Sequence, residues 1–151
     1  MTIYRERLWA SAWVFISTAL VIPASLLVFL PINFGVGVIV AIVLYAGCVA
    51  ILIATSPTIE VTTEQFVAGR ARLPVVFIGA VEGFRGNDAT LERGQRLDAR
   101  AWLLIRGWVG PVVRVDVLDA GDPTPYWVVS TRHPEDVVAA IATARATPGV
   151  V

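Results

Sequence analysis

The stretch LWASAWVFISTALVIPASLLVFLPINFGVGVIVAIVLYAGCVAILIATSPTI, from Leu8 to Ile59, contains no charged side chain. Soluble domains carry about one charged residue in four, so an apolar run of this length is typical of membrane segments. One helix needs roughly 20 residues to cross the hydrocarbon core. The run therefore predicts two spans, over residues 8–30 and 36–54, joined by a tight turn at Pro31–Gly35.

Small residues recur at every fourth position of the second span, at Ala46, Ala50 and Ala54. This spacing forms a groove that lets another helix approach closely. The partner is either the first span of the same chain, a second copy of the protein, or a subunit of a larger complex. Apart from Tyr45 and Cys48 the spans hold no ionisable residue, which argues against a proton relay or an ion pathway.

Arginines flank the apolar run on both sides, whereas the connecting turn is uncharged. Arg5 and Arg7 precede the run, and Arg70 and Arg72 follow it. The positive-inside rule then places both termini in the cytoplasm and the protein in the plasma membrane. A cleaved signal peptide fits poorly, because the apolar core continues beyond the small residues around Ser25.

The composition outside the apolar run is that of a small soluble domain. The chain has 151 residues, 56% of them hydrophobic and 16% charged, with a net charge of zero. About 90 residues follow the run, enough for one domain with a modest core. No basic field exists that would attract nucleic acid, and the single Cys48 cannot form a disulfide within the chain. We therefore expect a hairpin over residues 1–57 and a cytoplasmic domain over residues 58–151.

The second half of the chain is rich in β-branched residues and turn signals. Alternation of apolar and polar residues predicts strands, whereas residues 83–100 are polar and irregular and are expected to form a long loop. The expected strands cover residues 58–62, 65–70, 75–82, 101–106, 112–118 and 125–131.

A C-terminal helix is expected over residues 134–146. Pro134 suits the first helical turn, acidic residues follow it, and Val137, Val138 and Ile141 give an apolar stripe. Short antiparallel strands followed by one amphipathic helix predict an α+β protein in which a small sheet or partly closed barrel is plugged by the helix. This is the pleckstrin-homology-like architecture; a split sheet with one packed helix is the alternative.

Two segments carry a resemblance to a known family. The segment YRERLW at Tyr4–Trp9 and the segment DAGDPTPYWVVSTR at Asp119–Arg132 resemble a family of small actinobacterial membrane proteins, the domain-of-unknown-function family DUF3093. The resemblance implies a two-helix protein of the plasma membrane and no catalytic residues. The end of the second segment is also similar to bacterial membrane-tethered pleckstrin-homology-like domains, where it would mark the last strand and the start of the helix.

Groups capable of chemistry are few and poorly placed. Asp116, Asp119 and Asp122 could ligate a divalent cation, but spacing of three along a strand spreads side chains about 10 Å apart. The only histidine, His133, has no second metal-binding neighbour, and its neighbour Ser130 lies in no nucleophile motif. We expect no catalytic residues, no cofactor and no metal.

Candidate contact residues lie in the expected loops. Trp108, between Gly107 and Val109 in a turn, could touch the bilayer or a protein partner. Arg93, Arg96 and Arg100 could bind lipid phosphates or an acidic partner. Interleaved carboxylates weaken that field. The leading hypothesis is a non-enzymatic membrane protein that presents a β domain for protein or lipid-headgroup binding. The alternative is an accessory subunit of a larger membrane enzyme or transport complex, assembled through its helices.

Overall fold

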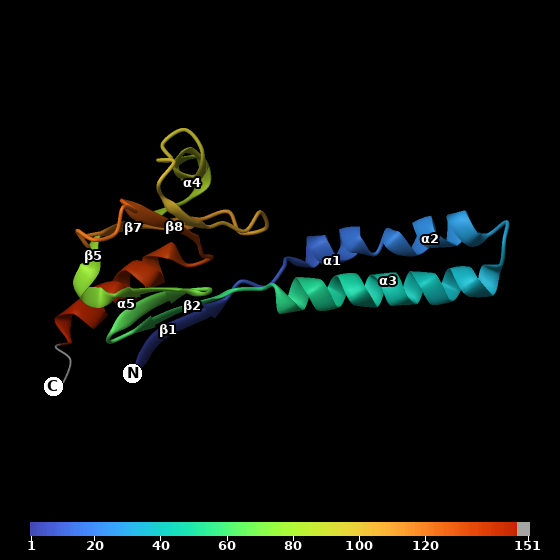
Figure 1. Cartoon of the computed structure of the whole chain (residues 1–151), viewed down its shortest axis with the longest axis horizontal. Helices are drawn as coiled ribbons and strands as arrows, with labels where there is room; N and C mark the ends of the chain where they lie inside the picture. Colours follow the sequence, from blue (N-terminus) through green and yellow to red (C-terminus); the bar gives the residue numbers. More distant parts are fainter. Residues whose placement is uncertain (148–151) are drawn as a thin grey trace. The chain divides into compact units, whose positions relative to one another are not determined.

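The computed structural model describes residues 1–147 and divides the chain into two compact units. The first, here called the β unit, contains Met1–Leu8 and the chain from Pro57 onward; the second, the hairpin unit, is Trp9–Ser56. The expected boundary at residue 57 is therefore wrong for the N-terminus. Residues Thr2–Arg7, assigned to the hairpin by the sequence, form strand β1 of the β unit (Figure 1). Their alternating half-buried positions suit the edge of a sheet.

The first apolar segment of the hairpin unit is two short helices rather than one. Helix α1 covers Ala12–Thr18 and α2 covers Val21–Phe29. Pro23 explains the break, because its ring excludes the carbonyl four residues earlier. The backbone tightens there, and Ile22 N–H bonds the carbonyl of Ala19, three residues back, at 3.0 Å.

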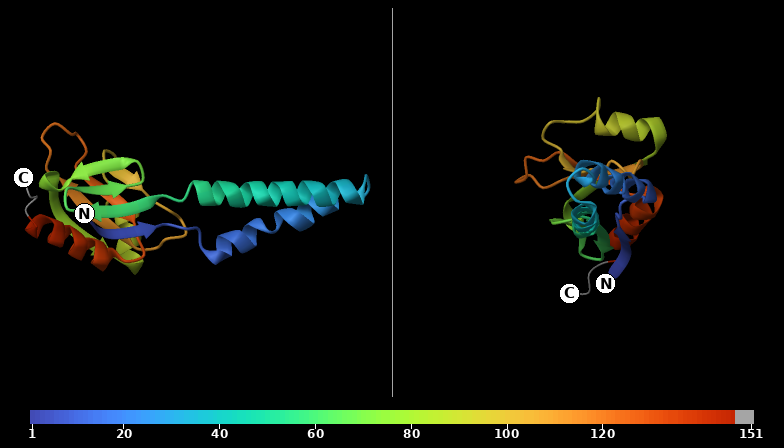
Figure 2. Two further views of the ribbon diagram at one scale, coloured as in Figure 1. Left: turned by 90° about the horizontal axis from the view of Figure 1, so that it is seen from below. Right: turned by 90° about the vertical axis from the view of Figure 1, so that its right-hand side faces the viewer.

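The second apolar segment is the continuous helix α3, Phe34–Ala54 (Figure 2). It begins where the Asn33 side chain accepts a hydrogen bond from Val36 N–H at 3.2 Å, the usual way of capping a helix. By length and composition, Ala12–Phe29 and Phe34–Ala54 could each cross a membrane. Most large apolar side chains on them are exposed, as expected of helices solvated by lipid.

The first sheet of the β unit is an antiparallel meander in the order β1-β2-β3-β4. Its last three strands are β2 (Thr58–Thr62), β3 (Gln65–Ala68) and β4 (Ala71–Pro74). Gly69 adopts a φ of 64° in the turn between β3 and β4, a left-handed conformation that favours glycine. The hairpin unit is thus inserted between two hydrogen-bonded neighbours, β1 and β2.

The second sheet has the order β5-β7-β8-β6. A 3-10 turn at Val75–Phe77 replaces the expected start of β5, and β6 pairs with β8 in parallel, which the all-antiparallel expectation missed. The strands are β5 (Ile78–Phe84), β6 (Trp102–Leu104), β7 (Val112–Val117) and β8 (Tyr126–Ser130).

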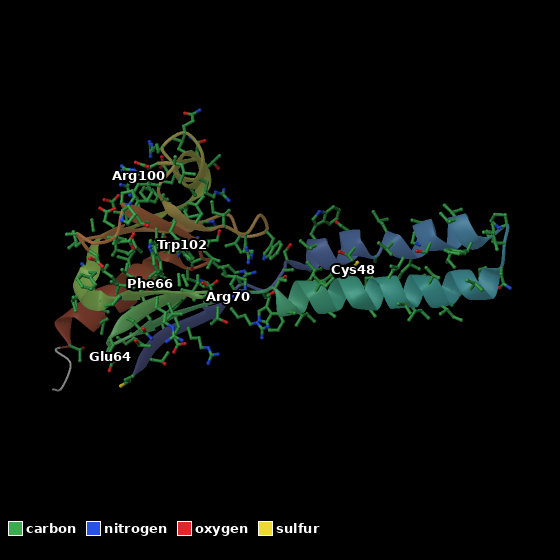
Figure 3. The ribbon with its side chains drawn as sticks, in the orientation of Figure 1. Cys48, Glu64, Phe66, Arg70, Arg100 and Trp102 are labelled. Atoms are coloured by element: carbon green, nitrogen blue, oxygen red, sulfur yellow. The ribbon has the colours of Figure 1, made fainter. Side chains whose placement is uncertain are left out.

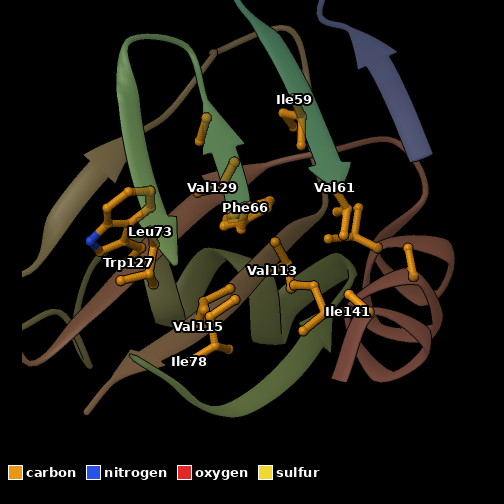
Figure 4. Close-up of a cluster of buried hydrophobic side chains, with 14 of the residues drawn as sticks. Ile59, Val61, Phe66, Leu73, Ile78, Val113, Val115, Trp127, Val129 and Ile141 are labelled. Carbon is orange, nitrogen blue, oxygen red and sulfur yellow. The ribbon is translucent and has the colours of Figure 1, made fainter. Parts of the chain in front are cut away.

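Helix α5, Pro134–Ala146, packs against β1 and β2 of the first sheet and against β5 and β7 of the second. Apolar side chains of both sheets and of α5 meet in one core (Figure 4). Trp127 of this core packs against the partly buried Trp102, with ring centroids 4.5 Å apart and the ring planes tilted by 41°. The α+β class, with two apolar N-terminal helices, antiparallel sheets and a C-terminal helix, is confirmed.

The expected loop at residues 83–100 contains helix α4, Gly86–Arg93. Together with the following segment, α4 covers the outer face of the second sheet, where Ala89 and Leu97 contact Tyr126 and Val128. Strand β8 is consequently buried on both faces. This explains its continuous apolar sequence, which is typical of a strand covered on both sides.

Candidate functional site

A buried carboxylate joins the first strand to the start of the last helix. The Glu6 side chain, only 10% exposed, accepts hydrogen bonds from the Tyr4 hydroxyl at 3.0 Å and from Thr131 Oγ1 at 2.5 Å. It also accepts one from Arg132 N–H at 3.1 Å, and the Arg132 guanidinium lies 3.6 Å away. Charge-assisted hydrogen bonds of this kind are the strong ones. Glu6 therefore fixes β1 against the connection between β8 and α5.

The same surroundings change the pKa of the Tyr4 hydroxyl. Burial of its ring, reinforced by the negative charge of Glu6, raises the pKa of Tyr4 to about 12. The hydroxyl therefore stays protonated at neutral pH and can donate to the carboxylate. Sequence reasoning had assigned this segment to the flank of a membrane span, so it missed the network. The only available signal was that both Tyr4–Trp9 and the segment ending in Ser130-Thr131-Arg132 carry the family resemblance.

Trp108 lies at the same end of the β unit, in the loop between β6 and β7. It is half-buried against the core rather than free in solvent, and its indole N–H points to the Leu8 carbonyl at 3.4 Å. The neighbouring Arg106 N–H donates to Ser130 Oγ at 3.0 Å. This loop therefore lies directly beside the point at which the chain leaves for the hairpin.

The structure does not gather Arg93, Arg96 and Arg100 into one patch. Arg96 pairs with Glu92 at 3.2 Å. Arg100, on the α4 side of the β unit (Figure 3), pairs with Asp98 at 3.1 Å, and this lowers the pKa of that carboxyl. Arg93 instead donates to the carbonyl oxygens of its own helix and of Val109. Only Arg93 reaches toward the loop that holds Trp108.

A second polar cluster lies beneath α4, and sequence reasoning did not identify it. The Glu92 carboxylate is 4% exposed and forms ion pairs with Arg96 and, at 3.6 Å, with Arg114. The Arg114 guanidinium stacks on the Tyr126 ring, 3.9 Å from its centroid. Tyr126 in turn accepts a hydrogen bond from Asp98 N–H at 2.6 Å. These contacts tie α4 and the loop after it to the second sheet.

The three aspartates considered as metal ligands serve local structure. Asp116 pairs with Arg114 at 3.2 Å, Asp119 accepts from Gly121 N–H, and Asp122 accepts from Thr124 N–H. The last bond lowers the pKa of Asp122. Within residues 1–147 no three His, Cys, Asp or Glu side chains are placed to hold a metal ion.

Ser130 and His133 also lack the geometry of a catalytic pair. Ser130 is completely buried, and its oxygen accepts the Arg106 backbone N–H. His133 precedes α5, and its Nδ1 lies 4.0 Å from Asp136. Nearby, the hydrogen bonds from Arg85 lower the pKa of Glu135 to about 2, so this exposed pair is ionised at neutral pH.

The end of the β unit opposite the Trp108 loop carries a shallow groove of about 570 Å³. Its lining includes Glu64 from the turn between β2 and β3, Val76 from the 3-10 turn, and Arg145 from α5. Val76 and the nearby Leu118 are among the most exposed large apolar side chains of the β unit, at 76% and 65%. This end therefore combines apolar contact area with a charge of each sign.

The small-residue positions of α3 divide into two sets. Gly37 and Ala41 are buried against α2, and a Cβ at Gly37 would lie 3.0 Å from Phe29 Cβ. Ala46, Ala50 and Ala54 are all exposed in the hairpin unit. The packing between α2 and α3 therefore uses the first set. Of the second set, Ala46 borders the crevice between these helices together with Ile22 and Leu26.

Fold and sites together define a class: an α+β chain in which an apolar helical hairpin interrupts the first sheet of a β unit. The family model described as "Protein of unknown function (DUF3093)" matches residues 3–141, so the chain belongs to this family. The match extends from β1 into α5 and covers both units. Neither the curated proteins nor the solved structures contain a match.

Proposed function

We propose that this protein is a non-enzymatic protein of the plasma membrane that presents a cytoplasmic β unit for binding a protein or lipid headgroups. The observation that carries the proposal is the insertion of the hairpin unit between β1 and β2. These strands pair from Thr2↔Thr62 to Arg7↔Thr58. Paired strands must lie on one side of a membrane, so the chain between them crosses it an even number of times. Two apolar helices satisfy this condition.

The charge distribution supports the cytoplasmic orientation. Arg7 ends β1, directly before the apolar segment, and Arg70 lies in the turn after β3. The turn between α2 and α3 holds no charge. A bias of arginine toward one side marks the cytoplasmic face.

The arrangement of the β unit supports a binding role. We infer a pleckstrin-homology-like plan, and this is supported by a four-stranded meander, a second meander of β5, β7 and β8, and a C-terminal helix that packs against both sheets. We infer that β6 and α4 are additions to this plan on the outer side. The polar side chains considered for catalysis, such as Ser130, form structural hydrogen bonds instead, which fits a binding scaffold better than an enzyme.

Cysteine labelling tests the topology, because Cys48 is the only cysteine. In a Cys48→Ser background, Ile32→Cys probes the turn between α2 and α3, and Glu64→Cys probes the β unit. In intact cells a membrane-impermeant maleimide should label only the first variant; permeabilisation should expose the second. The reversed pattern would contradict the orientation, and labelling of both in intact cells would contradict a spanning hairpin.

Affinity purification from native membranes tests the binding role. The full-length protein, extracted in a mild detergent, should retain a protein or lipid through its β unit. Substitution of the exposed Val76 by Asp separates the two cases, since it should release a protein bound at the groove and leave bound lipid unchanged. Recovery of a lone monomer free of protein and lipid would refute the proposal.

A second candidate, assembly into a larger membrane enzyme or transport complex, is favoured by the exposure of Ala46, Ala50 and Ala54. Close helix contact at such positions depends on small side chains. Ala50→Leu should therefore dissociate the assembly on native gels. Cys48→Leu, which adds bulk on the opposite side of α3, is the matched control. Unchanged migration of the Ala50→Leu protein would exclude this mode of assembly.

A further inference from the structure

Four segments of the β unit meet where the chain leaves it for the hairpin. Leu8 N–H donates to the Pro57 carbonyl at 2.9 Å, which continues the pairing of β1 with β2. Gly69 N–H donates to the Thr58 carbonyl at 2.8 Å, and Trp108 donates to the Leu8 carbonyl. We call residues 7–8, 57–58, 69–70 and 105–111 the exit face.

The exit face is basic. Its charged side chains are Arg7, Arg70 and Arg106, and it contains no carboxylate. Arg93 reaches it from α4, since its guanidinium donates to the Val109 carbonyl at 3.4 Å. Cationic side chains thus approach the same end from different elements of the β unit.

The opposite end of the β unit carries charges of both signs. Glu64 lies in the turn between β2 and β3, and Asp119 and Asp122 lie in the turn between β7 and β8. Arg145 lines the groove at this end together with Glu64. Figure 3 shows Arg70 and Glu64 at opposite ends of the unit, so the exit face differs from the groove end in containing basic side chains without carboxylates.

The carboxylates near the start of α5 lie outside the exit face. Glu6 is nearly buried and is held by Arg132. Glu135 is paired with Arg85 at 2.5 Å. Asp136 lies 4.0 Å from His133 and is exposed. It adds one negative charge on α5, outside the exit face.

Resting on the proposed function, we propose that the exit face binds the phosphate groups of anionic phospholipids in the leaflet from which the hairpin emerges. Guanidinium groups match phosphate oxygens in geometry and charge. The linkers at residues 9–11 and 55–56 are short, so the exit face cannot move more than roughly 10 Å from the helix ends, which is about one Debye length.

Hydrogen exchange of the full-length protein in lipid nanodiscs tests this inference. One set of discs contains phosphatidylcholine alone, and the other contains equal parts of phosphatidylcholine and phosphatidylglycerol. Amides of residues 69–70 and 105–110 should exchange roughly fivefold more slowly in the anionic discs. The double variant Arg70→Gln, Arg106→Gln should lose this difference, whereas Arg100→Gln, on the α4 side, should keep it.

Equal exchange in both discs, or protection that persists in the double variant, would overturn the inference. Inorganic phosphate added to phosphatidylcholine discs should not reproduce the protection; if it does, the face recognises free phosphate rather than a membrane. Failure of the protein to enter either disc would contradict the spanning hairpin instead, so the two proposals fail separately.

Discussion

Removing the carboxylate at the centre of the β1–α5 junction should destabilise the β unit strongly. In Glu6→Ala the buried Thr131 hydroxyl and the Arg132 N–H lose their acceptor, and the Arg132 guanidinium loses its ion-pair partner. An unsatisfied buried polar group costs about 1–3 kcal/mol, and breaking a buried ion pair costs about 3–5 kcal/mol. Since the Arg132 guanidinium retains access to water, we expect Glu6→Ala to lower the free energy of unfolding by about 3 kcal/mol, the lower end of the range for a broken buried ion pair.

Urea unfolding of the full-length protein in detergent measures this loss. Trp102 and Trp127 report on the core, and replacing Trp9 and Trp13 by Phe removes the signal of the hairpin unit. For a urea dependence of about 1–3 kcal/mol per molar, the midpoint should fall by roughly 1–3 M. The control is Glu82→Ala, which removes the same side chain from an exposed position of β5 and should change stability by less than about 0.5 kcal/mol. If Glu6→Ala were no more destabilising than the control, Glu6 would not secure the junction.

Three further predictions concern the β unit. Trp127→Ala, at a 5% exposed position in the core, should cost about 3–5 kcal/mol in urea unfolding, and a loss below about 1 kcal/mol would show that the two sheets do not share this core. Gly69→Ala should cost about 1–2 kcal/mol because its φ is 64°, whereas Gly107→Ala, with open space around its Cβ, should cost less; equal costs would argue against the left-handed turn. The pKa of Tyr4 is raised from about 10 in the unfolded chain to about 12, so the contribution of Tyr4 to stability should be complete below pH 10 and should be lost as the pH rises toward 12. The urea midpoint of the unmodified protein should therefore fall over this pH range by more than that of Tyr4→Phe. An identical fall in both proteins would refute this prediction.

The sequence predicts the elements whose signal is local. The absence of charge from Leu8 to Ile59 needs no partner to interpret, and the alternation in residues 112–118 marks β7 directly. Proline before acidic residues likewise marks the start of α5. Each of these patterns arises from the solvent around one element, so the element can be recognised without knowing what it packs against.

The elements that sequence reasoning missed depend on distant partners. Strand β1 is stabilised by β2 and by Thr131, which lies 125 positions away in sequence from Glu6. In the sequence alone, the six residues of β1 include three charged ones and therefore resemble the flank of a membrane span. The parallel pairing of β6 requires β8 as its neighbour, and no local pattern in the sequence predicts which strand that neighbour is. Helix α4 has only a short apolar face, and its Gly86-Asn87-Asp88 start reads as a turn.

The candidate site was predictable only in part. Trp108 and Arg93 were identified as contact residues, and the structure places the Trp108 loop and the Arg93 guanidinium near each other. Arg96 and Arg100 form ion pairs with carboxylates close in sequence. Counting the charges in the loop could not show which of its arginines are paired in this way. Glu6 could not be identified, because its role exists only once β1 and the start of α5 are in contact.

The interruption of the first sheet by the hairpin has a consequence for biosynthesis. Strand β1 leaves the ribosome first but cannot pair until β2 has been made, and at 5–20 residues per second the intervening residues delay this by several seconds. During that time β1 has no strand partner. In the membrane orientation that we propose, insertion of the two helices would bring Arg7 and Thr58 together and would thereby reduce the loop-closure entropy that opposes strand pairing. The bilayer would then act as a template for the sheet, and the β unit would be completed only after the hairpin had been inserted.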